Sequence, residues 1–254
     1  MSTTASATRD QASPDHPTSE REIRVQLAAC YRLLHRFGMT DLIYTHVSAR
    51  LPGGEGHFLL NPYGLAFDEI TASSLVRVDR DGNPAGESDW PVNRAGFVIH
   101  SAVLAARADV NCVLHTHTRA GIAVSTLACG LLPISQHALK FHDRIGYHDY
   151  EGIACDLDER RRLVADLGPH GAMILRNHGL LTVGASVAEA FVTNYFLEMA
   201  CKVQIDAQAT GATLLRPSPE VRERTARQYE AGGEVSPWGA LLRLLDHEDP
   251  SWRD

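Results

Sequence analysis

The chain of 254 residues lacks long apolar runs, blocks of basic residues and a leader-like N-terminus. A helix that spans a bilayer needs about 20 apolar residues, and no such stretch occurs, so we expect no membrane partner. Lys and Arg number 24 against 31 Asp and Glu, a formal net charge of −7, so we expect no nucleic-acid partner either. The polar residues 1–18 contain no signal-peptide core, which favours a cytoplasmic protein.

Cysteine is also scarce. The five cysteines are odd in number and form no CxxC pair, so in a reducing compartment they are most simply unpaired thiols. Free cysteine is among the most buried residue types, which predicts that all five pack in the core. They are Cys30, Cys112, Cys129, Cys155 and Cys201.

What is present is typical of a globular protein, with 44% hydrophobic and 22% charged residues. Residues 1–19 are predicted to form a disordered tail. No repeat, linker or change of composition divides residues 20–254. We therefore expect one domain, with a C-terminal helical extension beyond residue 217 whose place in the fold the pattern does not indicate.

Local signals alternate between helix and strand. Ser19 and Glu22 have the capping-box form at the start of a helix that Gly38 is suited to end. Apolar periodicity and turn residues predict the other elements. Strands are expected within a hairpin over 44–60 and near 75–78, 110–117, 172–175 and 180–183, and helices over 93–106, 119–127, 156–168 and from 186 onward. This interleaving predicts an α/β domain.

Two histidines mark the end of one predicted strand. His115 and His117 are separated by one residue, and side chains alternate along a strand, so both project from the same face. Two imidazoles placed in this way can bind a divalent ion, and a third ligand would complete a site with an open position. His178, in the tight turn Asn177-His178-Gly179, is the best candidate for that third ligand.

Longer motifs surround these histidines: HSAVLAARADVNCVLHTH over 100–117, LRNHGLLTVG over 175–184 and AEA over 188–190. Together they resemble the class II aldolase/adducin family over about residues 22–210. The resemblance implies a three-layer α/β/α sandwich around a mixed, largely antiparallel sheet, and a homotetramer with active sites between subunits. It matches His115, His117 and His178 to the family's metal ligands, with Zn²⁺ as the first choice of metal and Fe²⁺ or Mn²⁺ as alternatives.

Departures from the family pattern concern the substrate. Gly96 stands where the sugar-phosphate aldolases carry a glutamate that is a metal ligand or base. Thr45-His46-Val47-Ser48 replaces the phosphate-binding Gly-Asn-x-Ser, and Val92-Asn93-Arg94-Ala95 replaces paired serines. Small residues and backbone amides let a loop close around phosphate, so an unphosphorylated small molecule is the predicted substrate. The candidate substrate-binding residues are His46, Asn93, Arg94, which could bind a carboxylate bidentately, His142 and His148.

The family's proton-donating tyrosine is matched, within one residue, by His137. An imidazole is suited to acid–base work near neutral pH, although an interface or packing role fits this position equally well.

These residues leave three functions open. The first is a metal-dependent lyase that breaks a C–C bond, by retro-aldol cleavage or decarboxylation, in a hydroxy or oxo carboxylate. The second is a non-haem iron(II) oxygenase acting on an aromatic 2-oxo acid, similar to family members that form prenylated hydroxybenzoate. The third, disfavoured because all three candidate ligands are present, is a non-catalytic interaction module like adducin.

Overall fold

The computed structural model describes residues 19–53, 56–86, 88, 90–152, 159–232 and 236–254. A seven-stranded sheet runs through this described part in the order β3-β2-β1-β4-β7-β6-β5. Every neighbouring pair is antiparallel except β5 and β6, which are parallel. The strands are β1 His46–Arg50, β2 Phe58–Leu60, β3 Val76–Val78, β4 Cys112–Thr116, β5 Gly146–His148, β6 Ala172–Leu175 and β7 Gly179–Gly184. The predicted mixed, largely antiparallel sheet is therefore confirmed.

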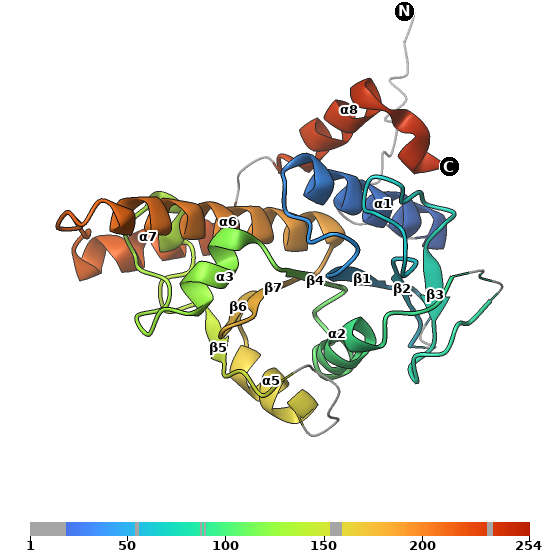
Figure 1. The fold of residues 1–254 in the computed structure, drawn as a ribbon, viewed down its shortest axis with the longest axis horizontal. Helices are drawn as coiled ribbons and strands as arrows, with labels where there is room; N and C mark the ends of the chain where they lie inside the picture. The colour runs from blue at the N-terminus through green and yellow to red at the C-terminus, as the bar shows by residue number, and fades with distance from the viewer. Residues whose placement is uncertain (1–18, 54–55, 87, 89, 153–158, 233–235) are drawn as a thin grey trace, which may run out of the picture.

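Helices cover both faces of the sheet, as Figure 1 shows. On one face α1 (Glu20–Arg36) contacts β1, and α6 (Val187–Ala209) contacts β4 and β7. On the other, α2 (Arg94–Ala106) contacts β1 and β4, and α5 (Glu159–Leu167) contacts β5 and β6. The other described helices are α3 Arg119–Ser125, α4 Gln136–Leu139, α7 Pro219–Ala231, α8 Trp238–Glu248 and the 3-10 helix η1 Pro250–Arg253. The predicted three layers are present.

The ends of these helices follow the sequence signals. The Ser19 hydroxyl accepts from the Glu22 amide while the Glu22 carboxylate accepts from the Ser19 amide, which completes the predicted capping box. Gly38 follows α1 with φ +65°, a left-handed conformation that glycine adopts without a Cβ penalty. The side chains of Asn93 and Ser186 cap α2 and α6 by accepting from the amides of Gly96 and Glu189.

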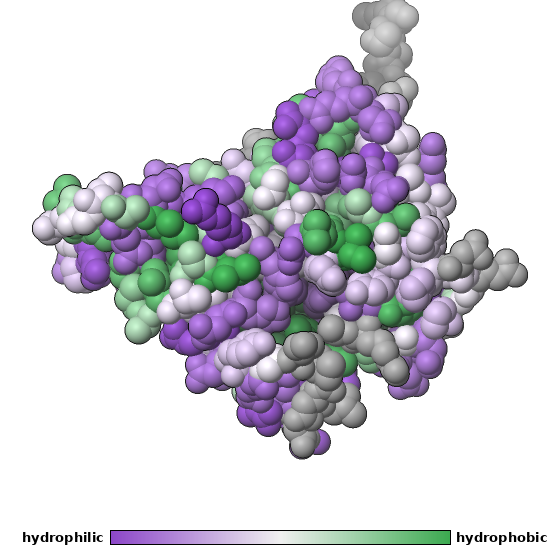
Figure 2. All heavy atoms as spheres, viewed as in Figure 1, coloured by the Kyte–Doolittle hydropathy of each residue, from purple (hydrophilic) through white to green (hydrophobic). Residues whose placement is uncertain are grey.

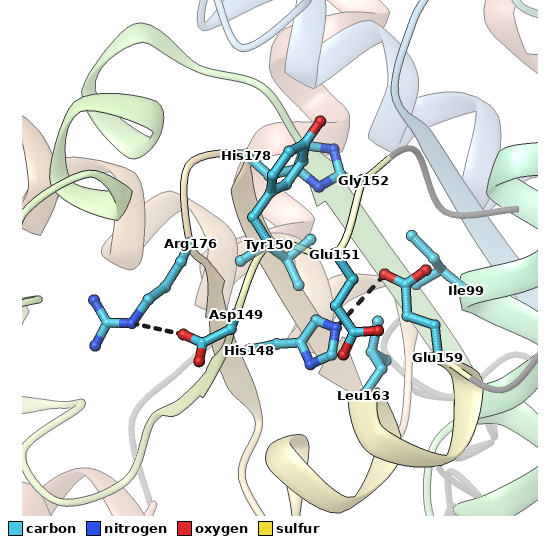
Figure 3. A pocket seen from close by; sticks show the side chains of 11 residues that line it. Ile99, His148, Asp149, Tyr150, Glu151, Gly152, Glu159, Leu163, Arg176 and His178 are labelled. Carbon is cyan, nitrogen blue, oxygen red and sulfur yellow. Dashed lines mark ion pairs between the residues drawn. The ribbon is translucent and has the colours of Figure 1, made fainter. Parts of the chain in front are cut away.

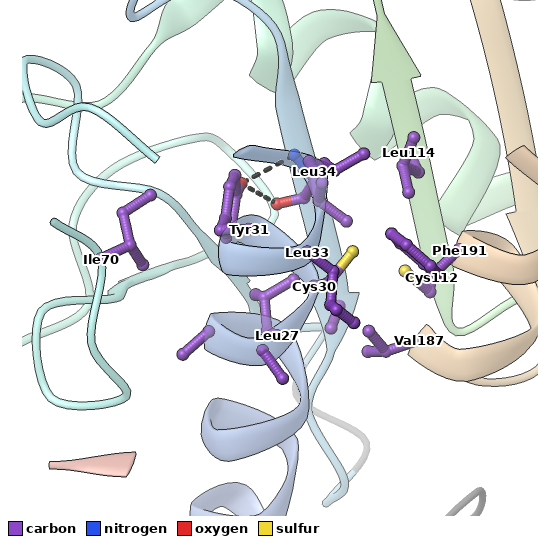
Figure 4. Packing of buried hydrophobic residues seen from close by; sticks show 14 of the residues in the cluster. Leu27, Cys30, Tyr31, Leu33, Leu34, Ile70, Cys112, Leu114, Val187 and Phe191 are labelled. Carbon is purple, nitrogen blue, oxygen red and sulfur yellow. Dashed lines mark hydrogen bonds between the residues drawn. The ribbon is translucent and has the colours of Figure 1, made fainter. Parts of the chain in front are cut away.

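The two faces of the sheet bury separate cores. Leu114 of β4 packs on the α1 side with Leu27 and Phe191, a cluster shown in Figure 4. Val113, its neighbour in the chain, belongs to the opposite cluster with Val103 of α2. Because side chains alternate along β4, the next residue after Leu114 projects toward the α2 side, and that residue is His115.

The structure also corrects and completes expectations for individual segments. Cys129 lies exposed in the turn after α3, so the prediction that it is a core thiol is wrong; Cys30, Cys112 and Cys201 are buried as predicted. Cys155, the tail 1–18 and the start of the helix predicted from 156 lie outside the described residues. The C-terminal extension is placed by α7, which packs on α4, and by α8, which packs on α1. No helix among the described residues is both long and apolar enough to cross a membrane.

Candidate functional site

Three histidines converge where β4 ends. His115 lies in β4, His117 follows it directly, and His178 occupies the turn between β6 and β7. Because β7 pairs with β4, with Leu180 opposite Thr116, this turn lies beside the end of β4. The His117 Nε2 atom is 2.8 Å from His115 Nε2 and 2.9 Å from His178 Nε2, and the candidate ligand atoms all lie within 4.8 Å of one another.

The second nitrogen of two of these rings has a fixed partner. His115 Nδ1 lies 2.9 Å from the Leu180 carbonyl, and His117 Nδ1 lies 3.0 Å from a carboxylate oxygen of Asp41. Both partners are acceptors only, so each Nδ1 carries a proton and donates it, which leaves Nε2 with a lone pair in the neutral ring.

Burial keeps the rings of His115 and His178 neutral. Desolvation is the main cause that holds the pKa of His115 well below its usual value, and it lowers the pKa of His178 to about 4, with further contributions from His117 and His148. Lone pairs at these distances repel one another unless a cation lies between them. The three nitrogens, two of them on rings whose second nitrogen is held by Leu180 and Asp41, therefore fit a divalent metal ion of the kind that imidazole binds.

Helix α6 contacts the opposite face of β4. Thr116 and Thr118 alternate with the two histidines, so their side chains point the other way. The Thr116 hydroxyl donates to Asn194 at 3.4 Å, and the Thr118 hydroxyl donates to the buried carboxylate of Glu198. Asn194 and Glu198, one turn apart on α6, were not predicted; the only sequence signal is two polar residues at i,i+4 in an otherwise apolar helix face.

A second histidine pair lies next to the three. His46 is opposite His115 in the β1–β4 register, and their ring centroids are 5.3 Å apart. His46 Nδ1 is 2.9 Å from His100 Nε2, and His100 Nδ1 is 2.8 Å from the Ser48 hydroxyl. Desolvation holds the pKa values of His46 and His100 well below the usual range. A Cβ added at Gly96 would lie 2.5 Å from the His46 ring, so His46 fills the space in front of residue 96.

A small cavity begins at His178, which lines it together with Tyr150, and extends to His148 and Glu159, as Figure 3 shows. Its volume is about 10 Å³, room for about one water molecule. His148 Nδ1 lies 2.7 Å from Asp166, while its buried Nε2 is 3.6 Å from Glu159 and has no hydrogen-bond partner among the described residues. His148 thus presents an unsatisfied nitrogen to the cavity that His178 also lines.

The other predicted site residues have different surroundings. Asn93 caps α2 by accepting from the Gly96 amide at 3.3 Å. His137 packs on Phe196 of α6, with ring centroids 5.1 Å apart, and His142 lies 3.6 Å from Asp143. The side chain of Arg94 lies outside the described residues. The structure therefore gathers His46 and His148 around the three histidines, and the roles of the remaining candidates stay predictions.

Comparison with known proteins agrees with the fold. The model of the Class II Aldolase and Adducin N-terminal domain matches residues 25–205. The crystal structure of an aldolase II superfamily protein from Pseudomonas syringae has a TM-score of 0.88 at 52% identity and covers 98% of this chain and 100% of that one. An L-fuculose 1-phosphate aldolase from Glaciozyma antarctica has a TM-score of 0.81 at 28% identity and covers 95% of this chain and 98% of that one. Alpha-adducin of Mus musculus is 41% identical in an alignment 265 positions long that covers 97% of this chain and 36% of adducin. The chain belongs to the class II aldolase and adducin family.

Proposed function

We propose that the protein is a divalent-metal-dependent lyase that breaks a C–C bond in an unphosphorylated hydroxy or oxo carboxylate. The observation that carries this proposal is the convergence of three imidazole lone pairs on one point, with the second nitrogens of His115 and His117 already held. A metal ion bound there supplies Lewis-acid stabilisation of the charge that develops on a substrate carbonyl when the bond breaks.

The surroundings favour a substrate without phosphate. In this chain the groups at the position of the family's phosphate turn are bonded within the protein. The Val47 amide donates to the Tyr31 hydroxyl at 2.7 Å, and both His46 and the Ser48 hydroxyl are hydrogen-bonded to His100. A phosphate would have to compete with these buried contacts, whereas a carboxylate and a neighbouring oxygen could bind the open positions of a metal held by three histidines.

Proton transfer needs a side chain near the bound substrate. His148 is the described group best suited to it, because Asp166 orients its ring and its Nε2 faces the cavity shared with His178. His137, the proton donor expected from the sequence, remains a second candidate, and its place on the α6 surface suits a role in which a neighbouring subunit brings it to a site.

The test compares the wild-type protein with His178→Ala, and with His247→Ala as a control on an exposed histidine of α8. Protein stripped of metal and reloaded with Zn²⁺, Mn²⁺ or Fe²⁺ is screened for cleavage or decarboxylation of unphosphorylated hydroxy and oxo carboxylates. We expect metal-dependent turnover that His178→Ala abolishes and His247→Ala leaves unchanged. Consumption of dioxygen with Fe²⁺ and an aromatic 2-oxo acid would replace the lyase with an oxygenase.

A second candidate is a non-catalytic interaction module. The observation in its favour is the identity of 41% with alpha-adducin, higher than the 28% identity with the L-fuculose 1-phosphate aldolase. Wild-type protein that binds no metal at the three histidines would favour this candidate over both enzymes.

A further inference from the structure

The turn that joins α1 to β1 has an unusual backbone. The Tyr44 amide donates to the Asp41 carbonyl at 2.8 Å, which closes a four-residue turn. Leu42 within it has φ +52°, and Thr45 directly after it has φ +71°. Both values lie in the left-handed region that side-chain-bearing residues rarely adopt, least of all a β-branched one such as Thr45. Strained backbone of this kind persists where the surroundings hold it in place, and it concentrates at functional sites.

Contacts on both sides hold this turn. Before it, the buried Met39 bonds its amide to the Leu34 carbonyl and packs its sulfur 3.6 Å from the Asn194 amide nitrogen. After it, the Val47 amide and carbonyl both bond to the Tyr31 hydroxyl. Asn194 also bonds to Thr116, so a single side chain of α6 links the base of the turn to the metal-binding strand.

The turn places one carboxylate, that of Asp41, beside the three histidines. Asp41 Oδ2 lies 3.0 Å from His117 Nδ1, and the Asp41 side chain is 42% exposed against 23% for His117. The chain offers a matched pair elsewhere, because His35 Nδ1 lies 3.6 Å from Asp68 on the outer side of α1, with both side chains about half exposed. The two pairs have the same chemistry, but only the first lies on a ring whose other nitrogen faces two further imidazoles.

We propose that Asp41 is the positioning residue of the metal centre and that the strained turn 41–45 exists to hold it against His117. Asp41 accepts the Nδ1 proton, which fixes the tautomer and orientation of the ring and makes Nε2 a stronger donor to the metal. This inference rests on the proposed metal-dependent function, and its tests are measurements of metal binding.

The first experiment measures Zn²⁺ affinity by competition with a chromogenic chelator, and the absorption spectrum of the Co²⁺-loaded protein. Outer contacts of this kind change metal affinity by about 10–100-fold. We expect a loss of about 10-fold in Asp41→Asn, which keeps a neutral acceptor, a loss nearer 100-fold in Asp41→Ala, and a Co²⁺ spectrum changed in both. Asp68→Asn, the matched control, should bind like wild type.

A second pair of variants tests the backbone separately from the carboxylate. Leu42→Gly and Leu42→Pro both remove an exposed side chain, but glycine accepts φ +52° and proline is locked near −65°. We expect Leu42→Gly to bind Zn²⁺ like wild type and Leu42→Pro to lose affinity to the level of Asp41→Ala. Melting curves of metal-free protein show whether each variant is folded.

The outcomes separate the two proposals. Wild-type affinity in Asp41→Ala, or equal affinity in the two Leu42 variants, would overturn the positioning role while leaving the metal site intact. Wild-type protein that binds none of Zn²⁺, Mn²⁺ and Fe²⁺ would overturn the proposed function itself.

Discussion

Because His46 packs against Gly96, we expect alanine at position 96 to destabilise the protein, the reverse of its usual effect in a helix. Replacing a helical glycine with alanine normally stabilises a protein by up to about 1 kcal/mol. Here the new Cβ would lie 2.5 Å from one ring carbon of His46 and 2.7 Å from another. His46 is 4% exposed and its ring is bonded to His100, so the ring cannot shift away without breaking that bond. Overpacking costs about 1–3 kcal/mol, and a broken His46–His100 bond would leave buried polar atoms unsatisfied at a similar cost.

Gly96→Ala should therefore lower the free energy of unfolding by about 3 kcal/mol, which for a protein of this size lowers the Tm by about 6–12 °C. In a His46→Ala background the clash is absent, so the same substitution should be neutral or stabilising by up to about 1 kcal/mol. Thermal and urea unfolding of the wild type, both single variants and the double variant give the interaction free energy between positions 46 and 96 directly. A rise in Tm for Gly96→Ala in the wild-type background would refute the reasoning.

Three further predictions concern His178, Thr118 and His137. Metal-free protein should lose stability as the pH falls from 6.5 to 4, because His178 takes up a proton in the unfolded chain but has a pKa of about 4 in the folded protein. A pKa difference of about 2.5, at 1.36 kcal/mol per pH unit, amounts to a loss of about 3 kcal/mol in the free energy of unfolding. In urea titrations at several pH values, His178→Asn should flatten this decline. Thr118→Val, which removes a hydroxyl bonded to the buried Glu198, should lower the free energy of unfolding by about 1–3 kcal/mol, whereas Thr126→Val at an exposed helix end should change it little; equal effects would remove the special role of Thr118. If His137 is a proton donor, His137→Asn should lower turnover at unchanged metal content, and unchanged turnover would leave it a packing residue against Phe196.

Local features were predictable because their causes are local. Ser19 and Glu22 bond to each other across three residues, so the capping box can be read directly from the chain. His115 and His117 share a face because side chains alternate along a strand. Predicting this required only that the segment be assigned as a strand. His178 was identified from its turn, and the β4–β7 pairing then brings it to the end of β4.

The groups that hold these histidines were not predictable in the same way. Asp41 precedes His117 by 76 residues and Glu198 follows Thr118 by 80, so neither pair has a sequence spacing that indicates contact. Asp41 also depends on left-handed backbone at Leu42, where the sequence offers none of the glycine that usually signals such a turn. Positions of this kind follow from tertiary packing, and no periodicity encodes them.

The same distinction applies to the substrate region. Read along the chain, the histidine at position 46 and the glycine at position 96 are two separate departures from the sugar-phosphate aldolases. In the structure they are one feature, because the imidazole of His46 occupies the space that any side chain at residue 96 would need. A carboxylate side chain could occupy position 96 only after the imidazole had been removed, and removing it would also take from the buried His100 its bond to His46. The surroundings of the three histidines therefore disfavour a carboxylate side chain at position 96. Substrates of the proposed lyase are for this reason best sought among molecules that would themselves supply the remaining ligands to the proposed metal.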